Sequence, residues 1–419
     1  MLRKEPVWVL GAGMTGLAAS LTSGAAALEA EAAAGGICRS YFVASEGGAY
    51  RFEVGGGHWV FGGDPMLRRF LDGFGAWKAY ERRASVYFPE TGRRVAYPLQ
   101  SHLEELGGAA AARCRAEMES KKGEAPRTMA EWLEWRFGKT LNELFFGPFH
   151  ELYTAGLYTE IEPQDGYKTP EAGVAARAAG YNQTFLYPEE GLAAFADRLA
   201  ECGRVETGRR VVRVDGKEKA VILADGRVLP YGRLISTLPL DLMLGMAGVD
   251  VGEEPGPATS VLVVNLGGVR GARCPQDHWV YVPRSRSGFH RVGFYSNVDE
   301  SFLPAGSEGR VSVYVEKAAR RGNKPAGGDL DKYVEDVGEE LREWGFMERV
   351  EAVSVNWVET GYTWNRPGSR WREEAVGALR EEGIEMTGRY GKWRFQGMTD
   401  SLRDGLLAGA LAREWGRRE

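Results

Sequence analysis

The motif Gly11-Ala-Gly-Met-Thr-Gly16 constrains the fold of this 419-residue chain more than any other feature. It directly follows Val7–Leu10, a short apolar run with the length of a buried parallel strand. In such a unit the first glycine makes the turn, the second lets a pyrophosphate approach the backbone, and the third lets the helix pack on the strand. We therefore predict a dinucleotide phosphate at the start of a helix. The expected contacts are Gly11, Gly13, Met14, Thr15 and Gly16.

The next two segments indicate which dinucleotide is bound. Ala25–Glu29 is the expected second strand, and Glu29 at its end can accept hydrogen bonds from ribose hydroxyls, with Glu31 as the alternative. A Gly-Gly pair follows Glu29 by six residues. This spacing is typical of two-dinucleotide-binding flavoproteins, in which the stretch lies along the flavin, so it favours FAD over NAD. We assign Glu29, Gly35, Gly36 and Ser40 to the cofactor.

Composition and charge argue against several other functions. A net charge of -5 is unusual for a general nucleic-acid-binding protein, which carries a basic stripe. The four cysteines are far apart and form no Cys-x-x-Cys pair, so we predict no metal site and a reducing compartment. We find no signal peptide and no apolar run of about 18 residues, so we expect a cytoplasmic protein without a membrane-spanning helix.

The rest of the chain predicts two further parts. Residues 104–155 have a mostly helical pattern, in which Thr128-Met-Ala-Glu131 has the form of a capping box. Residues 258–316 alternate apolar and polar side chains, as an antiparallel sheet does. Further expected elements are a helix at 191–202, a hairpin around Asp225-Gly226, a helix at 328–345, a strand at 350–358 and a last helix at 401–418.

These patterns predict an α/β fold. We expect a Rossmann-type, two-dinucleotide-binding FAD domain, an inserted helical segment and an antiparallel-sheet substrate domain. The expected FAD domain comprises residues 1–103, 185–245 and 376–419. The helical segment is assigned to 104–184, and the sheet domain to 246–375.

Several blocks outside the first motif resemble one family. Gly57-His58-x-x-Phe61, Val95-Ala-Tyr-Pro-Leu-Gln100, Trp279-x-Tyr281-x-Pro283 and Gly388-Arg389 are similar to blocks of the UDP-galactopyranose mutases, especially their eukaryotic-type branch. The resemblance spans nearly the whole chain. Its flavin motifs are shared with amine oxidases and protoporphyrinogen oxidases.

The resemblance implies a flavin-dependent isomerase. Such an enzyme interconverts the pyranose and furanose rings of a nucleotide sugar without net redox change. The N5 atom of the reduced flavin attacks the anomeric carbon. A transient NAD(P)H or another reductant is implied as a partner. The alternatives are an FAD-dependent oxidoreductase of the amine oxidase or protoporphyrinogen oxidase type, and a non-catalytic FAD-binding protein.

The resemblance also implies roles for individual residues. His58 and Arg291 are the expected catalytic residues, with Arg291 also clamping the substrate diphosphate. Further cofactor contacts are expected at Gly57, Val211, Gly388, Arg389, Asp400 and Ser401, with Arg389 on the FAD pyrophosphate. Substrate contacts are expected at Phe61, Tyr97, Gln100, Asn182, Trp279, Tyr281, Arg291 and Tyr362.

The chain departs from the family pattern at three named positions. Phe395 stands where the family has a phosphate-binding tyrosine, Gly63 replaces a histidine, and His150 replaces an asparagine. These changes leave the flavin prediction intact. They keep the sugar, the base, and the choice between mutase and oxidase open.

Overall fold

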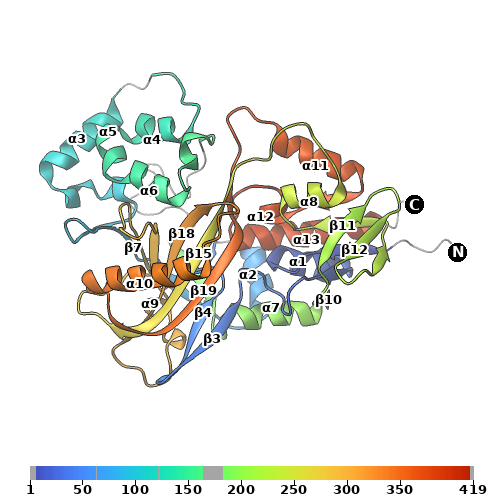
Figure 1. Ribbon diagram of the computed structural model, residues 1–419, viewed down its shortest axis with the longest axis horizontal. Coiled ribbons are helices and arrows are strands. Elements are labelled where there is room, and N and C mark those ends of the chain that lie inside the picture. Colours follow the sequence, from blue (N-terminus) through green and yellow to red (C-terminus); the bar gives the residue numbers. More distant parts are fainter. Residues whose placement is uncertain (1–5, 63, 121–122, 164–182, 416–419) are drawn as a thin grey trace.

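The computed structural model describes residues 6–62, 64–120, 123–163 and 183–415. In Figure 1 the helices formed by residues 108–153 lie at one end of the molecule. The long strands of a large sheet cross its middle. The first strand of the chain and its last helix lie together at the other end.

A parallel sheet forms the end that carries the glycine motif. Its five strands have the order β10-β2-β1-β14-β20, and every neighbouring pair is parallel. The chain therefore contributes to one sheet from its first strand to a strand near its end. In chain order the strands are β1 (Val7–Leu10), β2 (Ala26–Leu28), β10 (Val205–Glu206), β14 (Arg233–Ser236) and β20 (Ile384–Met386).

Two helices pack closely beside this sheet. α1 (Met14–Ser23) follows the glycine turn and ends at Gly24, whose left-handed φ of 73° glycine adopts without strain. α13 (Met398–Trp415) lies against α1. A Cβ at Gly405 would overlap the carbonyl oxygen of Thr15, and one at Gly409 would overlap the Thr22 hydroxyl. The two glycines therefore let the backbones approach more closely than larger residues would. The last helix begins at 398, three residues before the expected start.

A seven-stranded sheet forms the middle of the molecule, in the order β19-β15-β18-β17-β16-β7-β8. All its neighbouring pairs are antiparallel except β16 with β7, which is parallel. α10 (Gly327–Glu343) packs its apolar residues on one face of this sheet. The strands are β7 (Ala84–Phe88), β8 (Arg93–Ala96), β15 (Ala258–Arg270), β16 (Trp279–Tyr281), β17 (Arg291–Phe294), β18 (Arg310–Arg320) and β19 (Met347–Thr363).

The parallel pair extends the expected sheet beyond its expected bounds. We expected an antiparallel sheet built from residues 246–375, and we assigned residues 1–103, which include β7 and β8, to the FAD domain. Instead, β7 pairs with β16 in the register Ser85 to Val280, and β8 follows it as the edge strand. The pairing takes this form because the N-terminal strands reach the sheet from a different part of the chain, without a hairpin that would force antiparallel order.

The helical segment lies over the sheet near β18. The predicted capping box is present: the Glu131 N–H donates to the Thr128 hydroxyl, and the Thr128 N–H donates to the Glu131 carboxylate. The segment comprises α3 (Gly108–Glu119), α4 (Met129–Phe137), α5 (Lys139–Leu141), a π-helical stretch (Asn142–Phe146) and α6 (Gly147–Tyr153).

Smaller elements complete the described chain. They include the predicted Asp225-Gly226 hairpin between β12 and β13, and the predicted helix α7. Within the described ranges, no helix combines the length and apolar character needed to cross a membrane. The other strands are β3 (Ser40–Ser45), β4 (Gly48–Glu53), β5 (Val60–Phe61), β6 (Trp77–Glu81), β9 (Thr184–Pro188), β11 (Val211–Asp215), β12 (Ala220–Leu223) and β13 (Val228–Pro230). The other helices are α2 (Pro65–Asp72), α7 (Gly191–Cys202), α8 (Leu240–Ala247), α9 (Tyr295–Val298), α11 (Trp371–Glu381) and α12 (Gly388–Gly391), with 3-10 turns at Leu99–Ser101, Leu103–Leu106, Leu157–Thr159 and Glu300–Phe302.

Candidate flavin and substrate site

The glycine turn leaves the start of α1 open to an anion. Gly13 is the residue before the helix, no side chain caps it, and the first turn contains no acidic residue. A Cβ at Gly13 would meet no atom within 4 Å, whereas a Cβ at Gly16 would overlap the carbonyl oxygen of Gly11. Gly16 thus serves packing, and Gly13 borders open space in front of the backbone N–H groups of the first turn of α1.

Glu29, which we expect to bind a ribose, directly follows β2 and lies beside the glycine turn. Its buried carboxylate accepts hydrogen bonds from the Ala12 N–H at 2.8 Å and the Glu31 N–H at 2.9 Å. The alternative, Glu31, is exposed and pairs with Arg210. The Arg209 N–H donates to the Glu29 carbonyl, which brings the start of β11 beside the same strand end. Val211 is the buried first residue of β11.

The Gly35-Gly36 loop folds against the same turn. The Gly35 N–H donates to the Ala12 carbonyl at 2.8 Å, and a Cβ at Gly36 would lie 3.4 Å from the Cα of Gly13. The Ser40 hydroxyl points elsewhere: it donates to Glu53 and accepts from the Ala193 N–H. The backbone of the Gly-Gly loop, rather than the Ser40 side chain, therefore faces the glycine turn.

His58 lies at the end of a glycine loop packed against β18. Its Nδ1 is 3.2 Å from the Gly56 carbonyl, which can only accept, so Nδ1 carries the proton. Burial lowers the pKa of His58 to about 4, and the charge of Arg389 acts in the same direction. The ring is therefore neutral at pH 7 and presents Nε2 as an acceptor. A Cβ at Gly57 would overlap the Tyr314 hydroxyl, so no larger residue fits there.

Arg291 is held by a carboxylate that the sequence analysis missed. Its Nη2 donates to both oxygens of Glu316, at 2.5 and 2.6 Å. The Glu316 side chain is only 2% exposed, and its Oε2 lies 3.5 Å from Nε2 of His290. Burial opposes the charge of Glu316, but Arg291 outweighs it and lowers the pKa of that carboxyl to about 2. The signal was that Glu316 directly follows the alternating segment Val311–Val315 and continues the same strand.

Two predicted tyrosines, Tyr281 and Tyr362, lie near Arg291, and a third, Tyr97, contacts Tyr281. Tyr281 is the partner of Arg291 in the β16–β17 register, and the ring centroids of Tyr281 and Tyr97 are 4.6 Å apart. The ring centroids of Tyr362 and Tyr153 are 4.6 Å apart. Both Tyr362 and Tyr281 interact electrostatically with the Arg291 guanidinium. The structure therefore brings together residues predicted from four separate blocks.

Aromatic rings of α6 border this cluster. The Phe149 ring contacts Tyr281 and stacks on Tyr153, so the helical segment reaches the predicted substrate residues. His150 is buried, and its Nδ1–H donates to the Phe146 carbonyl. Gln100 is buried in the 3-10 turn that follows Tyr97. Asn182 and Gly63 lie outside the described residues.

Phe61 and Trp279 form a second aromatic contact near His58. Their rings are perpendicular, with centroids 6.3 Å apart, and both contact Phe185. The Trp279 indole N–H is buried without a hydrogen-bond partner in the part of the chain that the structure describes. A buried donor of this kind is available to a ligand acceptor.

Arg389 and Gly388 occupy different surroundings. Gly388 lies against the first turn of α1, where a Cβ would come within 2.5 Å of the Thr15 hydroxyl oxygen. The Arg389 guanidinium donates to the Gly361 carbonyl at 2.8 Å and lies over the rings of Tyr362 and Phe395. The Gly361 carbonyl and the two rings therefore hold the Arg389 side chain beside Tyr362. We expected this side chain on the FAD pyrophosphate.

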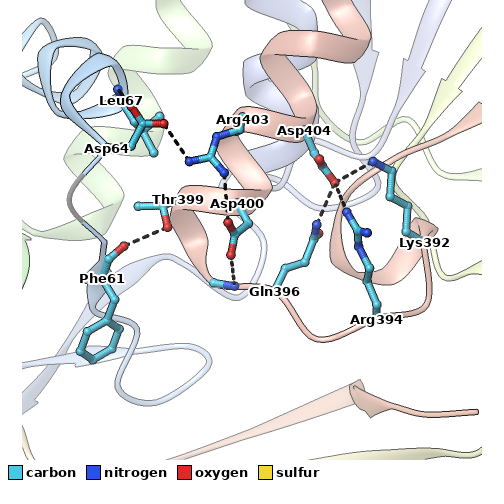
Figure 2. Close-up of polar contacts among 11 residues, drawn as sticks. Phe61, Asp64, Leu67, Lys392, Arg394, Gln396, Thr399, Asp400, Arg403 and Asp404 are labelled. Atoms are coloured by element: carbon cyan, nitrogen blue, oxygen red, sulfur yellow. Dashed lines mark hydrogen bonds and ion pairs between the residues drawn. The ribbon is translucent and has the colours of Figure 1, made fainter. Parts of the chain in front are cut away.

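The first turn of α13 is held by polar contacts, shown in Figure 2. Asp400 accepts from the Gly397 N–H, and the Ser401 N–H donates to the Gly397 carbonyl, so both residues lie inside the helix. The Thr399 hydroxyl donates to the Phe61 carbonyl at 2.9 Å. Arg403 joins the same turn to Asp64 at the start of α2.

The residues present fit a flavin dinucleotide. The open start of α1, the buried Glu29 and the Gly35-Gly36 loop form one continuous surface of backbone and carboxylate groups. The buried Tyr390 hydroxyl, next to Arg389, has no partner among the described residues, as expected where a ligand supplies one.

Fold and site together define a flavin enzyme of the amine oxidase type. The family model "Flavin containing amine oxidoreductase" matches residues 27–404, and the chain belongs to this family. Its cofactor is FAD.

Solved structures with the same fold include a reduced UDP-galactopyranose mutase, with 22% identity, a TM-score of 0.84, and coverage of 97% of this chain and 93% of that one. A redesigned putrescine oxidase gives 16% identity and a TM-score of 0.63, covering 97% and 98% of the two chains. A CLA-producing fatty acid isomerase from P. acnes gives 13% identity and a TM-score of 0.65, covering 99% of each chain.

Proposed function

We propose that this protein is an FAD-dependent pyranose/furanose mutase of nucleotide sugars, related to the eukaryotic-type UDP-galactopyranose mutases. The observation that carries the proposal is the position of Arg291, with Tyr281 and Tyr362 around it and the His58 loop beside it. The similarity to a reduced UDP-galactopyranose mutase over 97% of the chain supports it.

Each residue of the cluster then has a chemical task. Arg291 presents a fixed cation to the diphosphate, and the Tyr281 and Tyr362 hydroxyls donate to its oxygens. Tyr97 and Gln100 contact the base, by stacking and by amide hydrogen bonds. Neutral His58 borders the flavin without adding charge. When reduced, the bound flavin supplies the nucleophile for the anomeric carbon. A transient NAD(P)H is the proposed reductant.

The charge of the diphosphate requires a second cation, because Glu316 already balances Arg291. Arg389 is the candidate. No carboxylate pairs with it among the described residues; it donates to backbone carbonyls and lies over Tyr362. We propose that Arg389 shares the substrate diphosphate with Arg291. Its contact with Tyr362 links it to a residue already proposed to bind substrate.

The test is a titration of oxidised and reduced protein with UDP-, TDP- and GDP-sugars, followed by flavin absorbance. We expect a spectral change with one of them only in the reduced state. Arg291→Lys should weaken nucleotide-diphosphate binding about tenfold, because an ammonium cannot make the planar two-point contact. Arg286→Lys, at an exposed pair with Glu343, is the matched control and should bind as the wild type does.

The second candidate is an oxidoreductase of the amine oxidase or protoporphyrinogen oxidase type. Phe395 favours it, because a ring without a hydroxyl stacks at 6.3 Å on Tyr362, where a phosphate donor was expected. In an anaerobic mixture, an amine that bleaches the oxidised flavin, with no response to any nucleotide sugar, would establish the oxidoreductase and contradict the mutase.

A further inference from the structure

Glu53 is a fully buried carboxyl group with no task in the proposed reaction. It ends β4 and is 0% exposed. Beyond it the chain stays beside the loop that follows Gly36, because the Val54 N–H donates to the Arg39 carbonyl and the Gly55 N–H donates to the Ile37 carbonyl. Glu53 therefore lies directly behind a segment expected along the flavin.

The two carboxyl oxygens of Glu53 are not equivalent. Oε1 accepts from the Ser40 hydroxyl at 3.1 Å and from the Tyr187 hydroxyl. The Ser40 oxygen itself accepts from the Ala193 N–H, so its proton is directed at Glu53. Oε2 is buried with no hydrogen-bond partner in the described chain. A proton that binds to Glu53 therefore resides on Oε2.

The groups facing Glu53 come from several elements. Arg51 on the same strand adds a positive charge, while its guanidinium donates to Ser301 and lies over the Phe302 ring. Tyr295 faces it from α9, and Cys38 from the flavin loop. Burial raises the pKa of Glu53 to about 7, against the lowering effects of Tyr187, Arg51 and Ser40.

The Cys38 thiol, in the loop that follows Gly36, interacts electrostatically with both Glu53 and Arg389. Burial and then the charge of Glu53 raise the pKa of the Cys38 thiol to about 12, and the charge of Arg389 acts in the opposite direction. One side chain of the loop therefore lies within electrostatic reach of both Glu53 and Arg389. A charge added along this loop would act on Glu53 through a water-poor interior.

We propose that Glu53 takes up a proton when the bound flavin is reduced. An external donor supplies two electrons; the oxidised flavin takes both with one proton and becomes the reduced anion, and a second proton from solvent binds to the Glu53 carboxylate. The physical cause is the negative charge gained nearby, which favours the neutral form of a buried carboxyl. The inference requires bound FAD and is independent of the substrate.

The test is the reduction potential of the bound flavin between pH 6 and pH 9. Each proton taken up with two electrons contributes about 30 mV per pH unit, since a tenfold change in a two-electron equilibrium corresponds to about 30 mV. We expect the wild-type slope near and above pH 7 to be steeper than that of Glu53→Gln by up to this amount. Equal slopes for the two proteins would overturn the proposal.

Two further variants secure the result. Glu340→Gln replaces another buried glutamate, on α10 at the outer face of the large sheet, and should keep the wild-type slope. Tyr187→Phe removes a hydroxyl that favours the carboxylate, so the steep region should move to higher pH. If Glu53→Gln fails to retain FAD, Tyr187→Phe decides, and an unshifted profile counts against the proposal.

Discussion

The two ends of the candidate site offer different kinds of groups to a ligand. At the dinucleotide end, Gly11–Gly16 and the Gly35-Gly36 loop offer backbone groups that are adjacent in sequence. At the proposed substrate end, the groups are side chains: Tyr281 and Arg291 come from the successive strands β16 and β17, Tyr362 comes from β19 much further along the chain, and Arg291 is already bound to another side chain. Substitutions that add a side chain should therefore impair ligand binding most at the dinucleotide end. Substitutions that remove a side chain should impair it most at the proposed substrate end.

The largest effect is expected at the backbone end. Gly13→Leu should abolish FAD binding while the protein still folds, because the new side chain enters open space where the pyrophosphate belongs. Flavin content after purification, with circular dichroism as the folding measure, tests this. Gly16→Leu is the contrasting variant and should fail to fold, since its Cβ overlaps the Gly11 carbonyl. A yellow Gly13→Leu protein would contradict the phosphate assignment.

At the side-chain end, Arg291→Ala should lower the free energy of unfolding by about 3–5 kcal/mol, because it leaves the buried charge of Glu316 without its partner. Denaturant unfolding at pH 7 measures this. The double variant Arg291→Ala with Glu316→Gln should recover much of the loss. A single variant as stable as the wild type would show that the pair has no structural role.

The same pair has a defined pH dependence. The folded-state pKa of Glu316 is about 2, below its unfolded value near 4.5. Its contribution to stability is therefore complete above the unfolded value and is lost as the pH falls through the folded one. The difference in stability between wild type and Arg291→Ala should shrink between pH 4.5 and pH 2.

Glu53 lies behind the flavin loop, and its pKa is shifted in the opposite direction. Because its folded-state pKa of about 7 exceeds the unfolded value, the folded protein binds more protons between pH 4.5 and 7, and stability falls as the pH rises through that window. Glu53→Gln should remove this decrease and gain about 2–3 kcal/mol at pH 8 relative to wild type. Parallel pH profiles of the two proteins would contradict the assignment.

The smallest effect is expected where α13 meets the Phe61 loop. Thr399→Val keeps the shape of the side chain and removes the hydrogen bond to the Phe61 carbonyl. We expect a loss of about 1 kcal/mol in unfolding free energy, with unchanged FAD content. Thr22→Val, which removes another α13 contact away from Phe61, is the control for helix docking. A selective loss of FAD in Thr399→Val would show that Phe61 positions the flavin.

The dinucleotide end could be predicted because its information is local. Strand, glycine spacing and acidic residue lie within 30 residues, and each has one physical task. Sequence spacing also indicated that Tyr281 shares a strand face with Trp279. The family blocks supplied Arg291 and Tyr362, which the structure brings together.

What the sequence could not supply was which strands pair and in what register. Glu316 faces Arg291 only because β17 and β18 align in that register, and no local pattern encodes the register. The parallel β7–β16 pair was missed for the same reason. The direction of the Arg389 side chain depends on Gly361 and Phe395, which lie on separate elements.

The contact of α13 with α1 makes two segments that are far apart in this sequence depend on each other during translation. Gly405 and Gly409 meet the carbonyl of Thr15 and the hydroxyl of Thr22, and β20 completes a sheet begun by β1. Synthesis must therefore pass residue 386 before β20 can join the sheet, and residue 409 before α13 can dock on α1. A nascent chain stalled before residue 384 should stay colourless in excess FAD, and a chain that stops before α13 begins at residue 398 should leave the flavin fold open despite an intact glycine motif.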